Sequence, residues 1–362
     1  MNKINFIIAL ASGGTGGHIS PATAIYDDLK KEGVNPIFYT DYRGSNIITN
    51  RDYNIINSGS PSVRGLTKIF NLLKTIIGII QAIVFLHYNK IKLVIGFGGY
   101  ASVPTIIAAW ILRIPSILHE QNYVLGRANR FCLFFSNILA TSFDNEIKFK
   151  KNKSLYTGNP VRNSISQIGL KNYNPLKNKR ITLLIFGGSQ GSRLFSKIIP
   201  EALDKFPEKI KNKLLVFHQA RKEDINHLIY FYKKRNIEAH IDHYFNNIEK
   251  HYDSCDLVIS RAGASTVSEI SAVSRPSILI PYKNALDDHQ TKNAEQLASI
   301  GASILLNEAS LSSNTLFEKL EDLFNSPNKM KLMAKKAKTI HKPDSSKLII
   351  ELAMAKLNGV IK

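Results

Sequence analysis

Short apolar runs of strand length alternate with longer helix-like segments along most of the chain. Runs that are apolar throughout are typical of parallel strands buried on both faces, and helices between them form the crossovers. The pattern therefore predicts an α/β fold with helices on both faces of each parallel sheet. The predicted strands are residues 6–10, 36–40, 93–96 and 116–119 in the first half, and 181–186, 214–218, 257–260 and 277–281 in the second.

The length of the chain points to two domains. Its 362 residues exceed what one hydrophobic core usually serves, and 44% hydrophobic residues are enough to bury two cores. The Pro- and Asn-rich stretch 159–178 is the best linker candidate. We predict one domain at 1–163, a second at 164–343, and a terminal helix at 345–357.

Each half contains a glycine-rich turn between a predicted strand and a predicted helix. These are Ser12-Gly-Gly-Thr-Gly-Gly-His18 and Gly187-Gly-Ser-Gln-Gly-Ser192. Such a turn brings backbone N–H groups at the positive end of a helix close to an anionic ligand. The first turn matches neither a P-loop nor the Gly-x-Gly-x-x-Gly fingerprint. Two turns of this kind predict a site for a diphosphate and a second reactant.

Polar residues at other strand ends extend this prediction. His18, at the start of a helix, is a candidate general base or a candidate hydrogen-bond donor to a phosphate, and the alternative is a histidine that merely caps the helix. Gly96-Phe-Gly-Gly-Tyr100 and His119-Glu-Gln-Asn122 follow two further strands, where open α/β sheets bind ligands.

The second half contains a comparable segment, in which the end of a strand is followed by a turn and then by a helix. Its sequence is Ser260-Arg-Ala-Gly-Ala-Ser-Thr-Val-Ser-Glu269. A carboxylate placed like Glu269 can accept both hydroxyls of a ribose, or can simply favour the helix N-terminus. Gln290, beyond the next polar loop, could reach a sugar hydroxyl.

Charge and cysteine content restrict the function further. The formal charge of +20 suits nucleic acid, an anionic membrane or phosphorylated substrates, but no block of consecutive basic residues resembles a nucleic-acid arm. Cys132 and Cys255 have no metal or redox spacing, which indicates a reducing compartment. The chain has no Asp-x-Asp pair and no His/Cys cluster, so we expect a diphosphate site without metal or cofactor.

Residues 69–86 are nearly continuously apolar and admit three interpretations. The stretch is marginal as a transmembrane span because Lys74 and Gln81 interrupt it. A buried helix is the second interpretation, and a helix that dips into a membrane surface is the third. The residues that would form the surface patch are Leu72, Ile76, Ile79, Ile80 and Ile83, with Arg64, Lys68, Lys90 and Lys92 nearby.

Six motifs occur in one order: Gly-Gly-Thr-Gly-Gly-His18, Gly-Gly-Tyr100, His-Glu-Gln-Asn122, Gly-Asn-Pro-Val-Arg162, Gly-Gly-Ser-Gln-Gly191 and Arg-x-Gly-Ala-x-Thr-Val-Ser-Glu269. In this order they resemble the MurG family of bacterial peptidoglycan glycosyltransferases over nearly the whole chain. The resemblance implies a GT-B fold, in which two Rossmann-like domains face each other across a cleft. It also implies that the C-terminal helix, 344–362, packs back on the N-terminal domain.

The activity implied by the resemblance is an inverting sugar transfer. N-acetylglucosamine would move from UDP-N-acetylglucosamine to the 4-hydroxyl of the muramoyl sugar on undecaprenyl-pyrophosphoryl-muramoyl-pentapeptide, which converts lipid I to lipid II. The N-terminal domain would take the acceptor and the C-terminal domain the UDP-sugar. The same scaffold also serves UDP-N-acetylglucosamine 2-epimerases, which need no lipid acceptor, and this remains the alternative.

Site residues follow from the resemblance position by position. His18 would be the catalytic base, with Glu120 as the other candidate. Thr15, Gly16 and Gly17 would lie at the diphosphate and acceptor side, and Asn122 at the transferred sugar. Arg162 and Ser189 would help to hold the donor, and Phe245 would contact uracil through its backbone, although the family residue there is often aliphatic.

The remaining implied contacts lie in the second half. Glu269 would bind the ribose and Gln290 the sugar. The helix N-terminus that would meet the diphosphate comprises Ala264, Ser265, Thr266, Val267 and Ser268.

The resemblance further implies a peripheral protein at the cytoplasmic face of the inner membrane. Members of the family dock on an anionic membrane surface through an apolar patch flanked by basic residues, which favours the surface-patch interpretation of 69–86. Trp110 would be an additional contact. A nucleic-acid partner is not expected.

Overall fold

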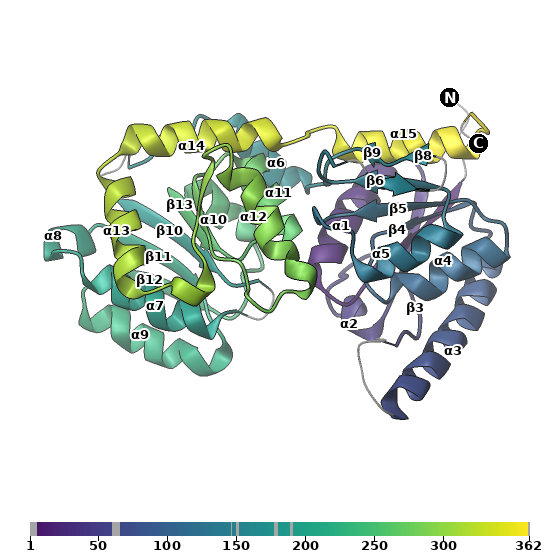
Figure 1. Ribbon diagram of the computed structural model, residues 1–362, viewed down its shortest axis with the longest axis horizontal. Coiled ribbons are helices and arrows are strands. Elements are labelled where there is room, and N and C mark those ends of the chain that lie inside the picture. Colours follow the sequence, from purple (N-terminus) through teal and green to yellow (C-terminus); the bar gives the residue numbers. More distant parts are fainter. Residues whose placement is uncertain are drawn as a thin grey trace. The chain divides into compact units, whose positions relative to one another are not determined.

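The computed structural model describes residues 6–59, 66–145, 147–149, 152–176, 180–188 and 191–360. The chain forms two compact units (Figure 1). Unit 1 comprises Met1–Arg162 together with Lys342–Lys362, and unit 2 comprises Asn163–His341.

Unit 1 is built on a seven-stranded sheet in the order β3-β2-β1-β4-β5-β6-β9, in which all paired strands are parallel. The four strands predicted in this half are confirmed. A small antiparallel pair, β7 and β8, lies outside the main sheet. The strands are β1 (Ile7–Ala11), β2 (Asn35–Thr40), β3 (Tyr53–Ile55), β4 (Leu93–Gly96), β5 (Ser116–Glu120), β6 (Ile138–Thr141), β7 (Lys148–Phe149), β8 (Asn152–Lys153) and β9 (Leu155–Tyr156).

Alternate residues of β1 show which helices cover each face of this sheet. Ile8 and Leu10 pack with α1 (Gly16–Lys31) and with α15 (Ser345–Leu357), whose Ile349, Ile350 and Ala353 are buried in the same core. Ala9 and Ala11 belong to the core on the other face. That face is covered by α3 (Leu66–Tyr88), α4 (Ser102–Ile111) and α5 (Arg127–Cys132), and the short α2 (Tyr42–Ser45) and η1 (Leu133–Phe135) complete the unit.

Unit 2 repeats this plan with a six-stranded sheet in the order β12-β11-β10-β13-β14-β15, again parallel at every pairing. Both units therefore have the Rossmann-like architecture that the sequence predicts. The strands are β10 (Ile181–Phe186), β11 (Leu214–Gln219), β12 (Glu238–Asp242), β13 (Leu257–Ser260), β14 (Ser277–Leu279) and β15 (Ser303–Leu305).

The helices of unit 2 also lie on both faces of their sheet. One core joins the strands to α7 (Arg193–Asp204), α9 (Ile225–Lys234), α13 (Ser313–Phe324) and α14 (Pro327–Ile340). On the other face, Tyr252 of α10 (Ile248–Ser254) packs against Phe186 of β10. The remaining helices are α6 (Asn163–Ser166), α8 (Glu208–Lys211), α10 (Ile248–Ser254), α11 (Ala264–Val273), α12 (His289–Ala298) and the short η2 (Gln167–Leu170), η3 (Lys222–Asp224), η4 (Leu286–Asp288) and η5 (Glu308–Ser310).

The predicted linker, 159–178, is only partly a linker. Its residues 163–170 form α6 and η2, which pack against α11 with Ile165 and Ile168 buried. The carbonyl oxygen of Ala272 lies so close to Gly169 that a Cβ there would approach it to 1.9 Å. The Pro- and Asn-rich composition suggested a linker, but the apolar residues within it are held by tertiary packing.

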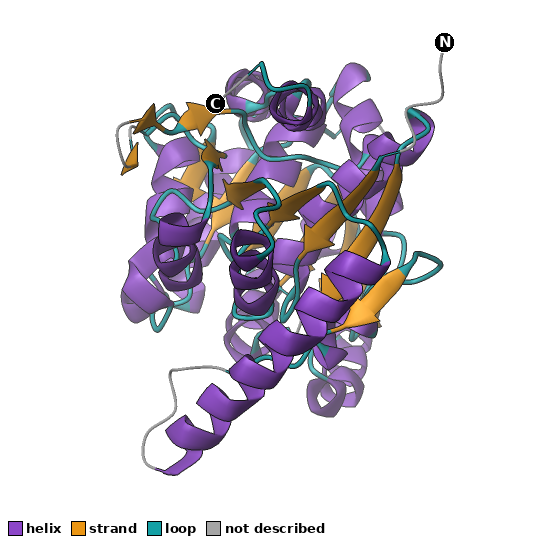
Figure 2. Cartoon of the chain, turned by 90° about the vertical axis from the view of Figure 1, so that its right-hand side faces the viewer, coloured by secondary structure: helices purple, strands orange, loops and turns teal. Residues whose placement is uncertain are grey.

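Helix α3 is largely exposed, so its interpretation as a buried core helix is wrong. Only Gly78, Ala82 and Leu86 are buried among its residues from 69 onward. An 18-residue window within Ile69–Tyr88 has a mean hydropathy of 2.1, and this stretch is long and apolar enough to cross a membrane by length and composition alone. Its first turns extend away from the sheet of unit 1 (Figure 2).

Candidate active site

The turn between β1 and α1 is fixed by a carboxylate from a neighbouring strand end. Asp41, directly after β2, accepts hydrogen bonds from the backbone N–H groups of Gly14 and Gly44, both at 2.9 Å. Gly13 packs so closely that a Cβ there would lie 2.6 Å from that of Ala101. Thr15 and Gly17 are exposed at the start of α1, so the positive end of this helix faces outward at the predicted position.

His18, in the first turn of α1, is half-buried and oriented by the segment that follows β5. Its Nδ1 lies 2.9 Å from Oε1 of Gln121. Its ring lies against Gly99, where a Cβ would approach the ring carbon Cδ2 to 3.2 Å and Gly13 O to 3.1 Å. Gly99 also has a φ of +72°, so both its backbone conformation and the nearby ring favour glycine.

Glu120, the second candidate base, is 1% exposed and is engaged with its own loop. Its Oε1 accepts hydrogen bonds from the backbone N–H of Asn122 at 2.9 Å and from Nδ2 of Asn122 at 3.1 Å. Its Oε2 accepts from Gly126 N at 2.9 Å and from Asn129 Nδ2 at 2.8 Å. This carboxylate therefore holds the loop that carries Asn122.

In unit 2, the N-terminus of α11 presents its backbone N–H groups as the sequence predicts. Gly263 caps the helix, and its carbonyl accepts the N–H of Val267 at 3.0 Å. The N–H groups of Ala264, Ser265 and Thr266 precede the first intrahelical bond and point out of the helix end. The side chain of Val267 is buried, and the Ser268 hydroxyl donates to Ala264 O at 2.9 Å.

The other proposed donor contacts of unit 2 have partners within the unit. Glu269 is half-buried, and its Oε2 accepts the phenol hydroxyl of Tyr252 at 3.2 Å. Gln290, in the first turn of α12, accepts the backbone N–H of Tyr282 through Oε1 at 2.9 Å. The half-buried ring of Phe245 packs against His251, with ring centroids 4.5 Å apart.

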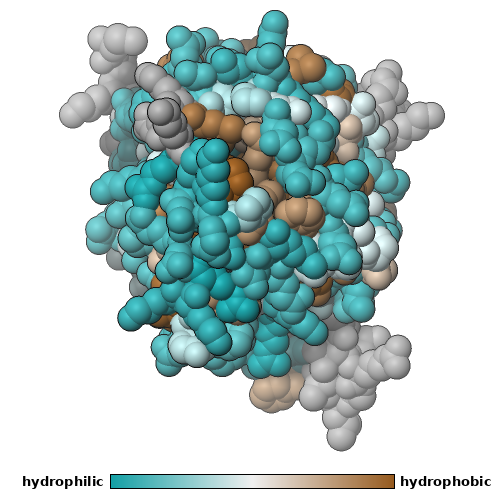
Figure 3. All heavy atoms as spheres, turned by 90° about the vertical axis from the view of Figure 1, so that its left-hand side faces the viewer, coloured by the Kyte–Doolittle hydropathy of each residue, from teal (hydrophilic) through white to brown (hydrophobic). Residues whose placement is uncertain are grey.

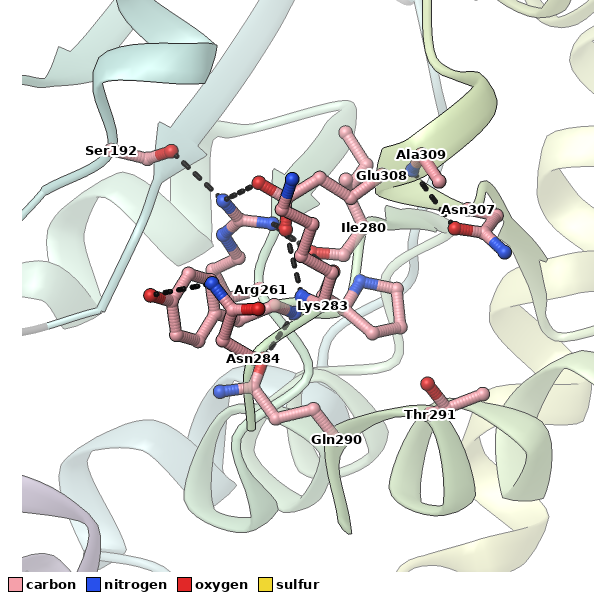
Figure 4. A network of polar contacts seen from close by, with 12 residues as sticks. Ser192, Arg261, Ile280, Lys283, Asn284, Gln290, Thr291, Asn307, Glu308 and Ala309 are labelled. Carbon is pink, nitrogen blue, oxygen red and sulfur yellow. Dashed lines mark hydrogen bonds and ion pairs between the residues drawn. The ribbon is translucent and has the colours of Figure 1, made fainter. Parts of the chain in front are cut away.

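One buried arginine joins several loops of unit 2 (Figure 4). Arg261, directly after β13, forms a two-point ion pair with Glu308, with Nη1 to Oε2 at 3.0 Å and Nη2 to Oε1 at 3.1 Å. Nη1 also donates to the carbonyls of Ile280 and Pro281, and Nη2 to the Ser192 hydroxyl at 3.2 Å. Glu308 Oε2 in turn accepts the backbone N–H of Lys283 at 2.8 Å. The pair thus ties the β10–α7 turn to the loop after β14.

Two family models match the chain. The N-terminal domain model of glycosyltransferase family 28 matches residues 8–140, and the C-terminal domain model of that family matches residues 182–349. The UDP-N-acetylglucosamine–N-acetylmuramyl-(pentapeptide) pyrophosphoryl-undecaprenol N-acetylglucosamine transferase of Brucella abortus (strain S19) is 37% identical, over 98% of this chain and 95% of the relative. The chain belongs to glycosyltransferase family 28.

Solved structures agree with the family 28 assignment. MurG from Acinetobacter baumannii superposes with a TM-score of 0.75 at 27% identity, and the match covers 96% of this chain and 98% of that one. UDP-GlcNAc 2-epimerase from Neisseria meningitidis reaches a TM-score of 0.67 at 12% identity, covering 96% and 100%, which shows a shared fold alone. The predicted GT-B class and the prediction of a glycosyltransferase are confirmed.

Within this family 28 chain, the predicted site residues gather in two places. His18 and the loop of Glu120 and Asn122 meet at the carboxyl edge of the unit 1 sheet. In unit 2, the first part of α11 carries residues 264–269, the first turn of α12 carries Gln290, and the loop between β12 and α10 carries Phe245. Arg162 is half-buried and is the last residue of the segment Met1–Arg162 of unit 1. Ser189 lies outside the described residues. Among the described residues, no group of three or more His, Cys, Asp or Glu side chains could hold a metal ion.

Sequence reasoning missed Gln121, Arg261 and Glu308 as organisers of the site. Gln121 and Arg261 lie inside motifs that were singled out, yet their partners become visible only in three dimensions. Glu308 follows β15 without any motif to mark it.

Proposed function

We propose that this family 28 enzyme transfers N-acetylglucosamine from UDP-N-acetylglucosamine to the 4-hydroxyl of the muramoyl sugar of lipid I, giving lipid II in peptidoglycan synthesis. The observation that carries the proposal is the 37% identity to the Brucella abortus transferase over 98% of the chain. The likeness to 2-epimerases is limited to the fold. The transfer is therefore favoured over epimerisation.

In unit 1, we assign His18 the role of general base. Histidine is the side chain that most readily exchanges a proton near neutral pH, and His18 is only half-buried. Glu120 is less suited because both its oxygens already accept hydrogen bonds from its own loop. Its proposed role is to place Asn122 at the transferred sugar. Thr15, Gly16 and Gly17 lie at the exposed start of α1 and would meet the diphosphate and acceptor.

In unit 2, the N-terminus of α11 would hold the diphosphate of the donor. Backbone N–H groups and the helix dipole stabilise negative charge there, and Arg162 would add a positive charge, so the leaving UDP needs no metal. Glu269 would accept the ribose hydroxyls, and Gln290 would contact the sugar. Phe245 and Ser189 remain proposed donor contacts.

The proposal is tested by incubating the protein with labelled UDP-N-acetylglucosamine and a short-chain lipid I analogue. A disaccharide product is expected, with UDP released only when the muramoyl acceptor is supplied and with activity unchanged by a chelator. A 2-epimer formed without acceptor would instead support the alternative. Loss of activity with the chelator would contradict the metal-free site.

Glu269→Ala is expected to raise KM for UDP-N-acetylglucosamine by about 10- to 100-fold, because hydrogen bonds to a charged group contribute roughly 1.5–3 kcal/mol. Steady-state kinetics at saturating acceptor measures the change. Tyr252→Phe is the matched control, since it removes only the hydroxyl that donates to Glu269 and keeps the carboxylate. An unchanged KM in Glu269→Ala would exclude contact with the ribose.

We further propose that unit 1 docks peripherally on the cytoplasmic face of the inner membrane through α3. Leu72, Ile76 and Ile80 of the predicted patch are 60%, 44% and 58% exposed. Ile79 and Ile83 are half-buried, but the neighbouring apolar side chains extend the patch. The additional exposed residues are Ile69, Phe70, Leu73, Ile77 and Val84 on α3, and Trp110 on α4.

The charge around this patch fits anionic lipid headgroups. Lys74 is exposed beside Phe70, and Lys90 and Lys92 are exposed just beyond the end of α3. Arg64 and the side chain of Lys68 lie outside the described residues. By contrast, the surface of unit 2 on the side of α8 and α13 is mainly hydrophilic (Figure 3).

The triple variant Leu72→Glu/Ile76→Glu/Ile80→Glu is expected to bind phosphatidylglycerol-containing vesicles at least about tenfold more weakly, because each buried methylene contributes about 0.8 kcal/mol to interfacial binding. Vesicle co-sedimentation measures this, and turnover of a water-soluble acceptor analogue should be unchanged. Ile229→Glu, at an apolar residue of α9 that is 49% exposed, is the control and should bind like the wild type. Equal binding by the triple variant would contradict docking through α3.

A further inference from the structure

A chain of hydrogen bonds connects His18 to a buried histidine through one glutamine. Gln121 is 1% exposed and His119 is fully buried. His18 Nδ1 lies 2.9 Å from Gln121 Oε1, and Gln121 Nε2 lies 3.0 Å from His119 Nδ1. His119 Nε2 lies 3.0 Å from the carbonyl oxygen of Gly158. All members of this chain belong to unit 1.

The donor and the acceptor in each of these hydrogen bonds can be assigned by starting from the buried His119. The Gly158 carbonyl can only accept, so His119 Nε2 carries a hydrogen and donates it. Burial lowers the pKa of His119 to about 4, so the ring is neutral at physiological pH and its Nδ1 is an acceptor. Ser142 Oγ, 3.4 Å from His119 Nε2, donates to Glu120 O and so remains able to accept from that nitrogen.

The orientation of the Gln121 amide follows from two acceptors. Its Nε2 faces His119 Nδ1 and also the carbonyl oxygen of His119, at 3.0 Å each. If the amide were rotated by 180°, its oxygen would face both acceptors with no hydrogen between them. The NH₂ group is therefore held toward His119, and Oε1 is held toward His18.

The geometry points to Gln121 as a positioning residue that keeps the ring hydrogen of His18 on Nδ1 and leaves the Nε2 lone pair open to the acceptor hydroxyl. An amide oxygen cannot donate, so Nδ1 must be the donor in the contact with Gln121. A histidine side chain in water favours the other tautomer, with its hydrogen on Nε2, and in that form Nε2 has no lone pair with which to take up a proton. The inference rests on the proposed role of His18 as the base.

The proton balance of the transfer is then complete. As the acceptor oxygen bonds to the anomeric carbon, its proton passes to His18 Nε2, and the bond from that carbon to the phosphate oxygen breaks. UDP leaves with the electron pair. His18 becomes an imidazolium whose Nδ1–H still donates to Gln121, and the proton on Nε2 is afterwards released to solvent.

Gln121→Leu tests the inference because leucine fills a similar volume but offers no acceptor. The tautomer of His18 is read from long-range ¹H–¹⁵N spectra of histidine-labelled protein at a pH where the ring is neutral, with the His18 signals assigned by their absence in His18→Asn. The wild type is expected to show the Nδ1–H form. Gln121→Leu should shift His18 toward the Nε2–H form and lower kcat by about 10- to 100-fold.

Further variants distinguish a positioning role of Gln121 from a general loss of folding. Gln121→Glu keeps an oxygen facing His18, so its His18 should retain the Nδ1–H form, whereas its second oxygen replaces the NH₂ group that donates to His119 and should lower the melting temperature. Gln296→Leu is the matched control, since the Gln296 amide donates to the carbonyl of Lys292 in its own helix, and it should leave both kcat and the tautomer unchanged. The Kd for UDP, which unit 2 is proposed to hold, should be the same in all variants. Thermal melting of each variant reports whether unit 1, which contains Gln121, is folded.

Two results would overturn the inference. One is an Nε2–H form of His18 in the wild type, or an Nδ1–H form that persists in Gln121→Leu. The other is a shifted tautomer with unchanged kcat, which removes its catalytic consequence. The spectra are recorded without turnover, so they test the tautomer of His18 even if no disaccharide forms in the activity assay. Absence of the disaccharide alone would count only against the proposed function.

Discussion

Replacing His18 with alanine is expected to lower kcat by about 10²- to 10⁴-fold, which is the usual contribution of a general base. The attacking hydroxyl would then lose its proton only to water. The proposed donor contacts of unit 2 are unaffected by this change, so KM for UDP-N-acetylglucosamine should stay within a few-fold of the wild type. Steady-state kinetics with the lipid I analogue measures both constants.

Two control variants test whether the loss of activity in His18→Ala is specific to the loss of the base. His227→Ala removes an exposed histidine of α9 and should leave kcat unchanged. Glu120→Gln keeps the size of the side chain but exchanges an accepting oxygen for an NH₂ group that faces hydrogen-bond donors. Its main expected effect is a lower melting temperature of unit 1. Near-normal turnover in His18→Ala would remove this residue from the role of base and return Glu120 to it.

Much of the fold could be predicted because central parallel strands are recognisable in the sequence as short apolar runs. The runs at β4, β10 and β13 are buried on both faces and are apolar except for Thr182 and Ser260. β12 was missed because it lies at a sheet edge, where Glu238, His240 and Asp242 alternate with half-buried residues. β3 and β15 are edge strands of three residues, too short to stand out from a loop.

The exposure of α3 could not be read from its composition. A helix that is apolar on all sides is equally compatible with a core and with a membrane surface. What decides is how much protein packs against it. Among the described residues of α3 from 69 onward, only Gly78, Ala82 and Leu86 are buried, and they lie on the side that meets the rest of unit 1. Gly78 allows that approach, since a Cβ there would lie 1.8 Å from Asn57 O.

In the candidate site, too, features set by neighbouring residues could be predicted from the sequence, and contacts between distant segments could not. Glycine turns and helix starts are local, so the turn before α1 and the N-terminus of α11 were found at their positions. The partners that orient the side chains come from distant segments. Gln121 reaches His18 from another strand end, and Glu308 reaches Arg261 from beyond β15. Pairs of this kind carry no spacing rule that one sequence could reveal.

Glu308→Ala is expected to destabilise unit 2 by about 3–5 kcal/mol, because it leaves the Arg261 guanidinium buried without its counter-charge. The side chains of this pair are only 9% and 12% exposed. For a unit of this size, that cost lowers the melting temperature by on the order of 10 °C. Differential scanning calorimetry measures it, and saturating UDP should recover part of the loss if the joined loops help to form the donor site.

A surface ion pair of similar geometry provides the control for this effect. Arg51 binds Asp27 through Nη2 at 3.0 Å, but these side chains are 23% and 42% exposed, so Asp27→Ala should cost at most about 1 kcal/mol. The double variant Arg261→Leu/Glu308→Leu removes both buried charges and should recover part of the stability lost in Glu308→Ala. Recovery stays incomplete because the carbonyls of Ile280 and Pro281 and the N–H of Lys283 lose their partners. If Glu308→Ala cost no more than Asp27→Ala, the pair could not be what holds these loops together.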